Sequence, residues 1–142
     1  MRLLIAALAA ACSPPAQTTP ATPPEAPSAE AESASLVAAL TPVVAADVGQ
    51  PNVTLTAETV RVQDDWGWLV AQPHGVDWSA TKYAARAEAG ALDGNGTTYA
   101  LLKRENGAWR VLDFVVGPTD VAYMDWPARH GAPPELMGLP AN

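Results

Sequence analysis

Residues 97–116 read TTYALLKRENGAWRVLDFVV and contain two runs of alternating side chains around an Asn-Gly pair. Asn106 and Gly107 both tolerate a positive φ, so the pattern predicts a β-hairpin with a two-residue turn. The simplest register pairs Leu101 with Leu112 and Tyr99 with Phe114 on one face, and Leu102 with Val111, Arg104 with Trp109 and Ala100 with Asp113 on the other. Large apolar side chains therefore fall on both faces. We expect this hairpin to lie centrally or in a strongly curved sheet, with other elements covering each face.

A second pair of strands is predicted upstream. Residues 53–57 carry apolar side chains at odd positions, whereas residues 60–62 carry them at even positions. The alternation changes phase near residues 58–59, which predicts a β-bulge or a bend. Residues 64–65 supply a turn, and residues 66–72 form the returning strand.

Helical signals flank the strands. Apolar residues recur at helical spacing over residues 36–48, with Ser35 as the N-cap and Gly49 as the stop, while Pro42 is expected to kink or restart the helix. Residues 79–94 are predicted to be helical or irregular.

The end of the chain also carries helical signals. Thr119 caps a short predicted helix over residues 120–126, which Pro127 ends, and one more turn runs through Leu136 and Met137.

Together the patterns predict an α+β domain, in which an N-terminal amphipathic helix packs on a curved four-stranded antiparallel meander with short C-terminal helical turns. This order of elements is similar to the cystatin-like and nuclear-transport-factor-like folds, which wrap a curved sheet around a helix. Residues 107–121 also resemble small exported proteobacterial proteins that have no assigned activity. The resemblance implies no catalytic residues.

The charge of the chain excludes one class of partner. The 142 residues carry a formal net charge of -7, from 8 Lys and Arg against 15 Asp and Glu. Binding to a nucleic acid requires clustered basic side chains, and here they are few and scattered. We therefore expect no nucleic-acid partner.

The N-terminus has the layout of an export signal, with Arg2, an apolar run over residues 3–11 and the single cysteine, Cys12. The run is too short for the roughly 20 residues that span a bilayer. Residues 8–12, LAAAC, resemble the lipobox of bacterial lipoproteins. The resemblance implies that a signal peptide of residues 1–11 is removed and that Cys12 carries a lipid that anchors the protein in the membrane. In the lipoproteins that this segment resembles, an Asp after the cysteine often signals retention in the inner membrane, so the resemblance implies that Ser13 favours the periplasmic face of the outer membrane.

Two alternatives remain for this segment, an ordinary signal peptide and a wrongly chosen start codon. A lone cysteine cannot form an internal disulfide, which also fits acylation of Cys12.

A linker is predicted to follow the cysteine. Residues 13–35 consist mainly of Pro, Ala, Thr, Ser and Glu, and such a segment cannot offset its ordering entropy by burial. Residues 12–35 are thus predicted to be the lipidated cysteine and a disordered linker, which would reach about 70 Å in a polyproline conformation. Residues 36–142 are predicted to form one domain.

Tryptophan is the most prominent candidate for ligand binding. Trp66 and Trp68 share a strand face across Gly67, and together with Trp78 they offer a possible surface for a sugar ring or for a partner's apolar side chain. The competing interpretation places these large side chains in the core of a small domain.

Asp113 is the candidate for a buried polar site. The predicted alternation places it among Trp109, Val111 and Val115. A buried carboxylate needs a partner, for which a backbone amide, a hydroxyl group or an arginine such as Arg61 or Arg86 is available.

Other motifs with catalytic or metal-binding chemistry are weak. Residues 79–82, SATK, match the S-x-x-K motif of penicillin-binding proteins, but the S-D-N and K-T-G partner motifs are lacking, and we interpret them as an exposed turn. Gly94-Asn95-Gly96 is interpreted as a turn and not as a phosphate loop. His74 and His130 lack the spacing of a metal site, so no metal or other cofactor is predicted.

These features favour an envelope lipoprotein without catalytic activity, whose domain binds a protein or cell-wall partner through an acidic, tryptophan-bearing face. The alternative is a small hydrolase or isomerase with a pocket inside a cone-shaped curved sheet, using Asp113 or His74. An inhibitor of a foreign enzyme in the periplasm would differ from the first hypothesis only in its partner. A concave pocket with Asp113 or a histidine at its base would favour the enzyme.

Overall fold

The structure is a computed structural model that describes residues 15–22 and 25–141. The expected signal peptide and Cys12 lie outside the described residues. The helices are α1 (Ala29–Val48), α2 (Ala84–Glu88) and α3 (Trp126–His130). The strands are β1 (Thr54–Gln63), β2 (Trp66–His74), β3 (Thr98–Glu105) and β4 (Ala108–Val116). The short 3-10 turns are η1 (Trp78–Ala80), η2 (Asp93–Asn95) and η3 (Pro134–Met137).

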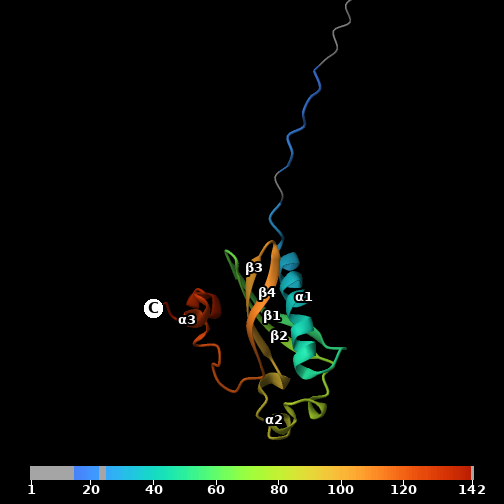
Figure 1. Cartoon of the computed structure of the whole chain (residues 1–142), viewed down its shortest axis with the longest axis vertical. Helices are drawn as coiled ribbons and strands as arrows, with labels where there is room; N and C mark the ends of the chain where they lie inside the picture. Colours follow the sequence, from blue (N-terminus) through green and yellow to red (C-terminus); the bar gives the residue numbers. More distant parts are fainter. Residues whose placement is uncertain (1–14, 23–24, 142) are drawn as a thin grey trace, which may run out of the picture.

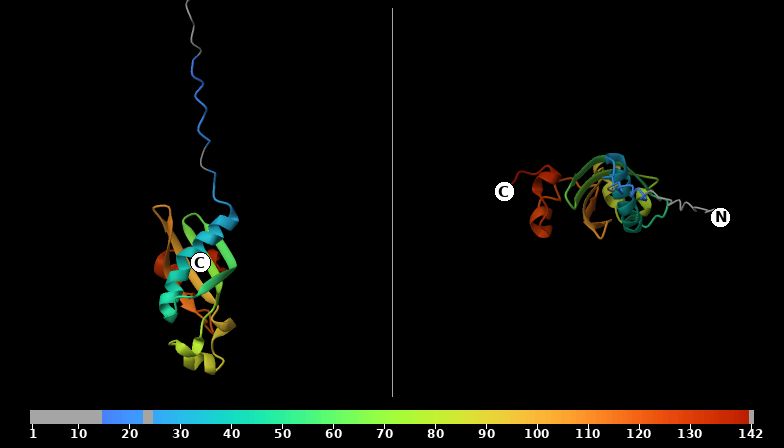
Figure 2. Two further views of the ribbon diagram at one scale, coloured as in Figure 1. Left: turned by 90° about the vertical axis from the view of Figure 1, so that its right-hand side faces the viewer. Right: turned by 90° about the horizontal axis from the view of Figure 1, so that it is seen from above.

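The strands form one antiparallel sheet in the order β1-β2-β3-β4. Helix α1 lies against one face and contacts both edge strands, β1 and β4. The sheet therefore curves around the helix without closing (Figure 1, Figure 2). The predicted α+β architecture is confirmed, including the N-terminal helix, the antiparallel meander and the C-terminal helical turns.

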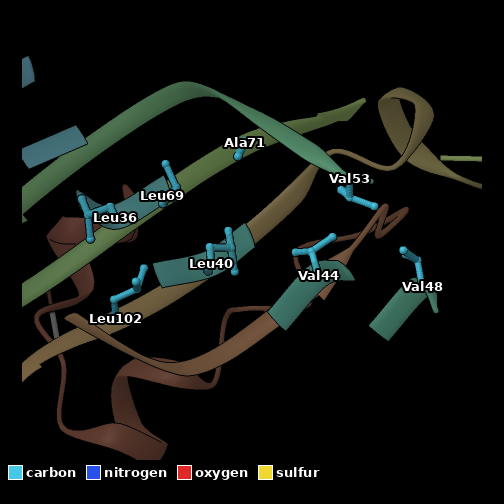
Figure 3. Packing of buried hydrophobic residues seen from close by; sticks show 9 residues of the cluster. Leu36, Leu40, Val44, Val48, Val53, Leu69, Ala71 and Leu102 are labelled. Carbon is cyan, nitrogen blue, oxygen red and sulfur yellow. The ribbon is translucent and has the colours of Figure 1, made fainter. Parts of the chain in front are cut away.

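The main core lies between α1 and the concave face of the sheet (Figure 3). One stripe of α1, spaced every four residues, points at the strands and is fully or almost fully buried: Leu36, Leu40, Val44 and Val48. It packs against Leu69 and Ala71 of β2 and Leu102 of β3. At about 1.5–3 kcal/mol for each large apolar side chain removed from water, this stripe is the chief reason that the helix stays on the sheet.

The predicted end of α1 is confirmed, and its predicted start is wrong. Gly49 ends the helix with a left-handed φ of 71°. The helix begins at Ala29 and not at Leu36, with Ser28 as the N-cap, whose hydroxyl accepts a hydrogen bond from the Ala31 amide at 3.2 Å. Residues 29–35 therefore belong to the helix and not to the linker.

Pro42 neither ends nor restarts α1, which runs through it. The proline lacks the N–H group that would bond to a carbonyl one turn earlier. Its side chain lies on the exposed side of the helix, and Thr41 beside it donates its hydroxyl to the Val37 carbonyl at 2.7 Å. The buried stripe on the other side holds the helix together across this position.

The two predicted hairpins are present. The phase change in β1 is a bulge, since the pairing with β2 shifts between Ala57 and Thr59. The β3–β4 turn has a positive φ at both Asn106 (52°) and Gly107 (78°), which fits the right-handed twist of the strands.

The register of β3 and β4 is confirmed only near their turn. Leu102 pairs with Val111 and Arg104 with Trp109, as predicted. Beyond these pairs β4 contains one extra residue, Leu112, so the predicted partners are wrong: Leu101 pairs with Asp113, Ala100 with Phe114, and Tyr99 with Val115. Val111 and Leu112 are both apolar, and residues 114–116 are apolar throughout, so the alternation in β4 does not mark this bulge.

The C-terminal segment covers the opposite face of the sheet, as expected for a hairpin that is apolar on both sides (Figure 1, Figure 2). There Trp68 and Leu101 pack with Trp126, Leu136 and Met137 in a second core. The helix predicted over residues 120–126 is wrong. Helix α3 begins at Trp126, and Pro127 lies in its first turn, where a proline is tolerated because no N–H group is needed.

Among the described residues, α1 is the one helix that is long and apolar enough to cross a membrane, with a mean hydropathy of 1.4 over 18 residues. Its leucines and valines nevertheless face the sheet. We therefore treat α1 as the core helix of the domain.

Candidate functional site

The three tryptophans proposed as a binding surface do not form one. Trp66 and Trp68 share a sheet face, as predicted, but the C-terminal segment covers it and Trp68 is only 3% exposed. Trp66 is partly exposed, with Nζ of Lys103 4.0 Å from its ring centroid. Trp78 lies in the β2–β3 connection, where its ring packs on Gly96 and edge-on against Tyr83.

Trp68 is the centre of an aromatic cluster. Its ring centroid lies 4.9 Å from that of Tyr123, 6.0 Å from that of Tyr99 and 6.1 Å from that of Trp126. Burial raises the pKa of Tyr99, and the charge of Asp93 adds to this. The cluster attaches the C-terminal segment to the sheet and leaves no flat tryptophan pair open for a sugar.

Asp113 is hydrogen-bonded to a backbone amide and to an arginine, which are two of the kinds of partner expected for its carboxylate. Its Oδ1 accepts a hydrogen bond from the Phe114 amide at 3.1 Å, and its Oδ2 lies 2.7 Å from Nη1 of Arg129 and 3.0 Å from Nε2 of His130. Nη2 of Arg129 also binds Oδ2 of Asp125 at 2.5 Å, and this hydrogen bond lowers the pKa of Asp125. The bulge in β4 places Asp113 on the sheet face that α3 covers, together with Val115 as predicted, whereas Trp109 and Val111 pack in the main core on the other face.

The arginines that the sequence offered to Asp113 bind main-chain carbonyls instead. Arg61 donates to the Leu136 carbonyl at 3.3 Å. Arg86 donates to the carbonyls of Ala91, at 3.2 Å, and Gly117. Arg61 therefore fastens η3 to β1, and Arg86 fastens α2 to the segment that follows β4.

The other motifs have structural partners. His74 Nε2 lies 3.0 Å from the Thr56 hydroxyl, on an exposed part of the sheet. Ser79 donates to Oδ1 of Asp77 at 2.5 Å, whereas Lys82 pairs with Asp47 at 2.6 Å, so the serine and lysine of the S-x-x-K match do not meet. Within the described residues, no group of three or more His, Cys, Asp or Glu side chains could hold a metal ion.

A groove with a volume of about 570 Å³ lies between the N-terminal half of α1 and the β3–β4 turn. We call it the helix–hairpin groove. Its lining residues are Pro27, Glu32, Ser35, Ala38, Ala39, Arg104, Gly107, Ala108 and Trp109. The start of α1 and the β3–β4 turn, which line the groove, lie at the end of the domain where the N-terminal segment enters α1 (Figure 1).

Charged and aromatic side chains are combined in this groove. Glu32 of α1 forms an ion pair with Arg104 of β3, and the side chains are 12% and 30% exposed. Cζ of Arg104 lies 4.4 Å from the centroid of the Trp109 ring, a cation–π contact. The indole also packs over Gly67, where an added Cβ would lie 3.2 Å from the ring.

A smaller hollow of about 140 Å³ lies in the C-terminal segment and is lined by apolar residues: Met124, Pro127, Ala128, Pro134, Leu139 and Pro140. Neither this hollow nor the helix–hairpin groove is lined by Asp113 or by a histidine. The geometry that would favour an enzyme is therefore not formed at either cavity.

Basic and acidic side chains differ in how many of them have a partner within the domain. Every lysine and arginine in the described part of the chain is engaged by a carboxylate, a main-chain carbonyl or an aromatic ring. Many carboxylates, including Glu58, Asp93 and Glu135, form no ion pair with described residues. The basic side chains are thus occupied by contacts within the domain, and the charges left without an ion-pair partner among the described residues include these carboxylates.

Sequence reasoning did not find the helix–hairpin groove, because it assigned Glu32 to the linker. Glu30 and Glu32 in the first turn of α1 are the signal that was present, since acidic residues favour a helix N-terminus. Comparison with known proteins found no matching protein-family model, no matching curated protein and no matching solved structure.

Proposed function

We propose that this chain is a lipid-anchored protein of the bacterial cell envelope, on the periplasmic face of the outer membrane, and that its domain binds a partner in the helix–hairpin groove without catalysing a reaction. The partner is a protein or a component of the cell wall. The observation that carries the binding role is the groove itself, about 570 Å³ in volume and lined by Trp109 and small side chains.

The location rests on the N-terminal sequence. An apolar run that ends in LAAAC at Cys12 is the pattern expected of an acylated cysteine. Each buried acyl CH₂ contributes about 0.8 kcal/mol, and more than one chain is enough for stable anchoring. Because α1 begins at Ala29, a polyproline-like linker from residue 13 to residue 28 would reach about 50 Å at about 3.1 Å per residue.

A membrane tether suits a binding domain. It confines the domain to a layer near the membrane and so raises its effective concentration toward a partner held in the same layer. Pro27, the second residue before α1, lines the groove. The groove would thus open near the point where the tether joins the domain.

Location can be tested by labelling cells with radioactive palmitate. We expect label on the wild-type protein and none on Cys12→Ala. Label retained by Cys12→Ala, or absent from both proteins at equal expression, would contradict the anchor.

Binding can be tested by capture from the native envelope with two matched variants. Ala38 lines the groove, and Ala46 is an exposed alanine of the same helix outside it. Ala38→Leu should fill the groove and abolish capture of a partner, whereas Ala46→Leu should capture as the wild type does. Capture that is equal in both variants would place the binding surface elsewhere.

A hydrolase or isomerase has weaker support. Its best candidate pair is Asp113 and His130, 3.0 Å apart. The carboxylate is also bound by Arg129 and by the Phe114 amide, and it lies outside both cavities. We therefore assign Asp113 to holding α3 on β4.

A further inference from the structure

We propose that Asn106 is a site of spontaneous deamidation, at which the Asn106–Gly107 pair closes to a succinimide ring and then opens to aspartate or isoaspartate. The modification needs water and no enzyme, and it does not depend on the proposed binding role of the helix–hairpin groove. The chain has a second Asn-Gly pair, Asn95–Gly96. The contrast between the surroundings of the two pairs carries the inference.

The reaction joins a side chain to the main chain of the next residue. The main-chain nitrogen of Gly107 attacks Cγ of Asn106, so that a new N–Cγ bond forms and the bond between Cγ and Nδ2 breaks. Nδ2 leaves as ammonia, with the proton that the attacking nitrogen gives up. Water then opens the ring at either of its two carbonyls, which yields aspartate or isoaspartate. A glycine after the asparagine favours the attack, because it has no Cβ to shield the nitrogen.

Asn106 and Gly107 lie at the tip of the β3–β4 hairpin. Both residues are exposed, and a Cβ added to Gly107 would meet no atom within 4 Å. Among the described residues, the Gly107 nitrogen and the Asn106 carbonyl take part in no main-chain hydrogen bond. The peptide group that must rotate toward the side chain is therefore held only by the turn itself, and an exposed turn of this kind opens at little cost in free energy.

The peptide group of Asn95–Gly96 is held on both sides. The Gly96 N–H donates to the Asp93 carbonyl at 2.8 Å, and the Asn95 carbonyl accepts a hydrogen bond from Nε2 of Gln72 at 3.3 Å. Gly96 is also buried, and the Trp78 ring packs on it. Attack by this nitrogen would break a hydrogen bond at a buried group and displace a packed peptide, so the loop must open first.

The main-chain conformation of the two asparagines does not explain the contrast. Their φ values are similar, 57° at Asn95 and 52° at Asn106. Glycine follows both of them. The difference therefore lies in the packing and the hydrogen bonds of the peptide group that reacts.

Deamidation at Asn106 would change one wall of the helix–hairpin groove. Both products replace a neutral amide with a carboxylate, and isoaspartate also lengthens the main chain between β3 and β4. Gly107 and Ala108 line the groove, and Ala108 pairs with Glu105 across the turn. The modification thus adds negative charge next to the groove and alters the turn that positions its hairpin side.

The test incubates the full-length chain in detergent, either folded or unfolded in urea, and follows both asparagines by peptide mapping with mass spectrometry. Conversion is recognised by the mass gained when NH₂ is replaced by OH. In the folded protein we expect Asn106 to convert about tenfold faster than Asn95 or more. Conversion should be faster at alkaline pH, because the attacking nitrogen must lose its proton. In urea the two sites should convert at similar rates.

Asn106→Gly is the control variant, since glycine also tolerates the positive φ of this turn. It should show no mass change in the turn peptide, and an unchanged melting temperature would show that it folds. The inference is overturned if Asn95 converts as fast as Asn106 in the folded wild type, or if Asn106 converts only in urea. A mass change that persists in the turn peptide of Asn106→Gly would also overturn it.

Discussion

The carboxylate of Glu32 in α1 pairs with the guanidinium of Arg104 in β3, and so connects the first turns of the helix to the far hairpin of the sheet. No side chain of residues 29–35 is fully buried. The ion pair is therefore the main tertiary contact of the segment that extends α1 toward the tether. It also forms one side of the helix–hairpin groove.

Glu32→Gln should loosen the start of the helix. Because the pair is only partly buried, we expect a loss of about 1 kcal/mol in the free energy of unfolding. Hydrogen exchange should become faster at the amides of residues 31–35 and stay unchanged near Val44. Glu30→Gln is the matched control, since Glu30 is exposed and forms no ion pair with described residues; an equal effect of both variants would show that the pair does not hold the segment.

Gly67→Ala should destabilise the domain without any backbone conflict, since the φ of Gly67 is not positive. The new Cβ would lie 2.7 Å from Cδ2 of Leu36, in a region that is fully packed. Overpacking of this kind costs about 1–3 kcal/mol, measured by urea unfolding. Combining it with Leu36→Val should recover part of the loss, and a double variant less stable than Gly67→Ala alone would reject this contact as the cause.

Tyr83 should make the domain sensitive to alkaline pH. Its hydroxyl donates to Oδ2 of Asp47 at 2.6 Å, and burial, followed by this hydrogen bond, raises its pKa above the ordinary value. A raised pKa means that the neutral tyrosine stabilises the folded state below the unfolded-state pKa of about 10, and that this contribution is lost as the pH rises further.

Tyr83→Phe should accordingly be less stable than the wild type at neutral pH but should lose less stability between about pH 9 and about pH 11. Urea unfolding at the two pH values measures the difference. Tyr99, whose pKa is also raised, is present in both proteins. Its ionisation therefore accounts for the loss of stability that Tyr83→Phe still shows between the two pH values. The same loss in both proteins would show that ionisation of Tyr83 is not linked to folding.

Trp68→Ala and Trp66→Ala compare the contribution to stability of a buried and of a partly exposed tryptophan in the same strand. Removing the buried Trp68 should cost about 3–5 kcal/mol, because its ring holds Tyr99, Tyr123 and Trp126 together. Trp66 is partly exposed, so its removal should cost much less. Thermal unfolding is the measurement, and a Trp68→Ala protein with wild-type stability would return this tryptophan to the list of ligand-binding candidates.

Much of the fold could be predicted from local chemistry. The turn at Asn106 and Gly107 is visible in the sequence because both residues tolerate a positive φ. The bulge after Ala57 is visible because it changes the phase of the alternation in β1. The bulge at Leu112 is invisible because Val111 and residues 114–116 are also apolar, so the alternation does not fix the register there. Pro127 predicts the end of a helix because a proline in the interior of a helix breaks it. A proline is also tolerated in the first turn, which is where Pro127 lies in α3.

The candidate site was harder to predict. Glu32 lies in a segment whose composition is that of a linker, and its ion-pair partner Arg104 is 72 residues away in sequence. Trp66 and Trp68 were correctly placed on one face, but the sequence does not show that α3 and η3 cover that face. Long-range contacts of this kind are absent from local patterns.

The most direct test of the groove as the binding site is crosslinking in living cells from a photoreactive amino acid at position 38, compared with the same amino acid at position 46. We expect a discrete adduct from position 38, which faces the groove, and none from position 46 on the same helix. Adducts of equal yield from both positions, or from neither while the protein is folded and present in the envelope, would contradict the account.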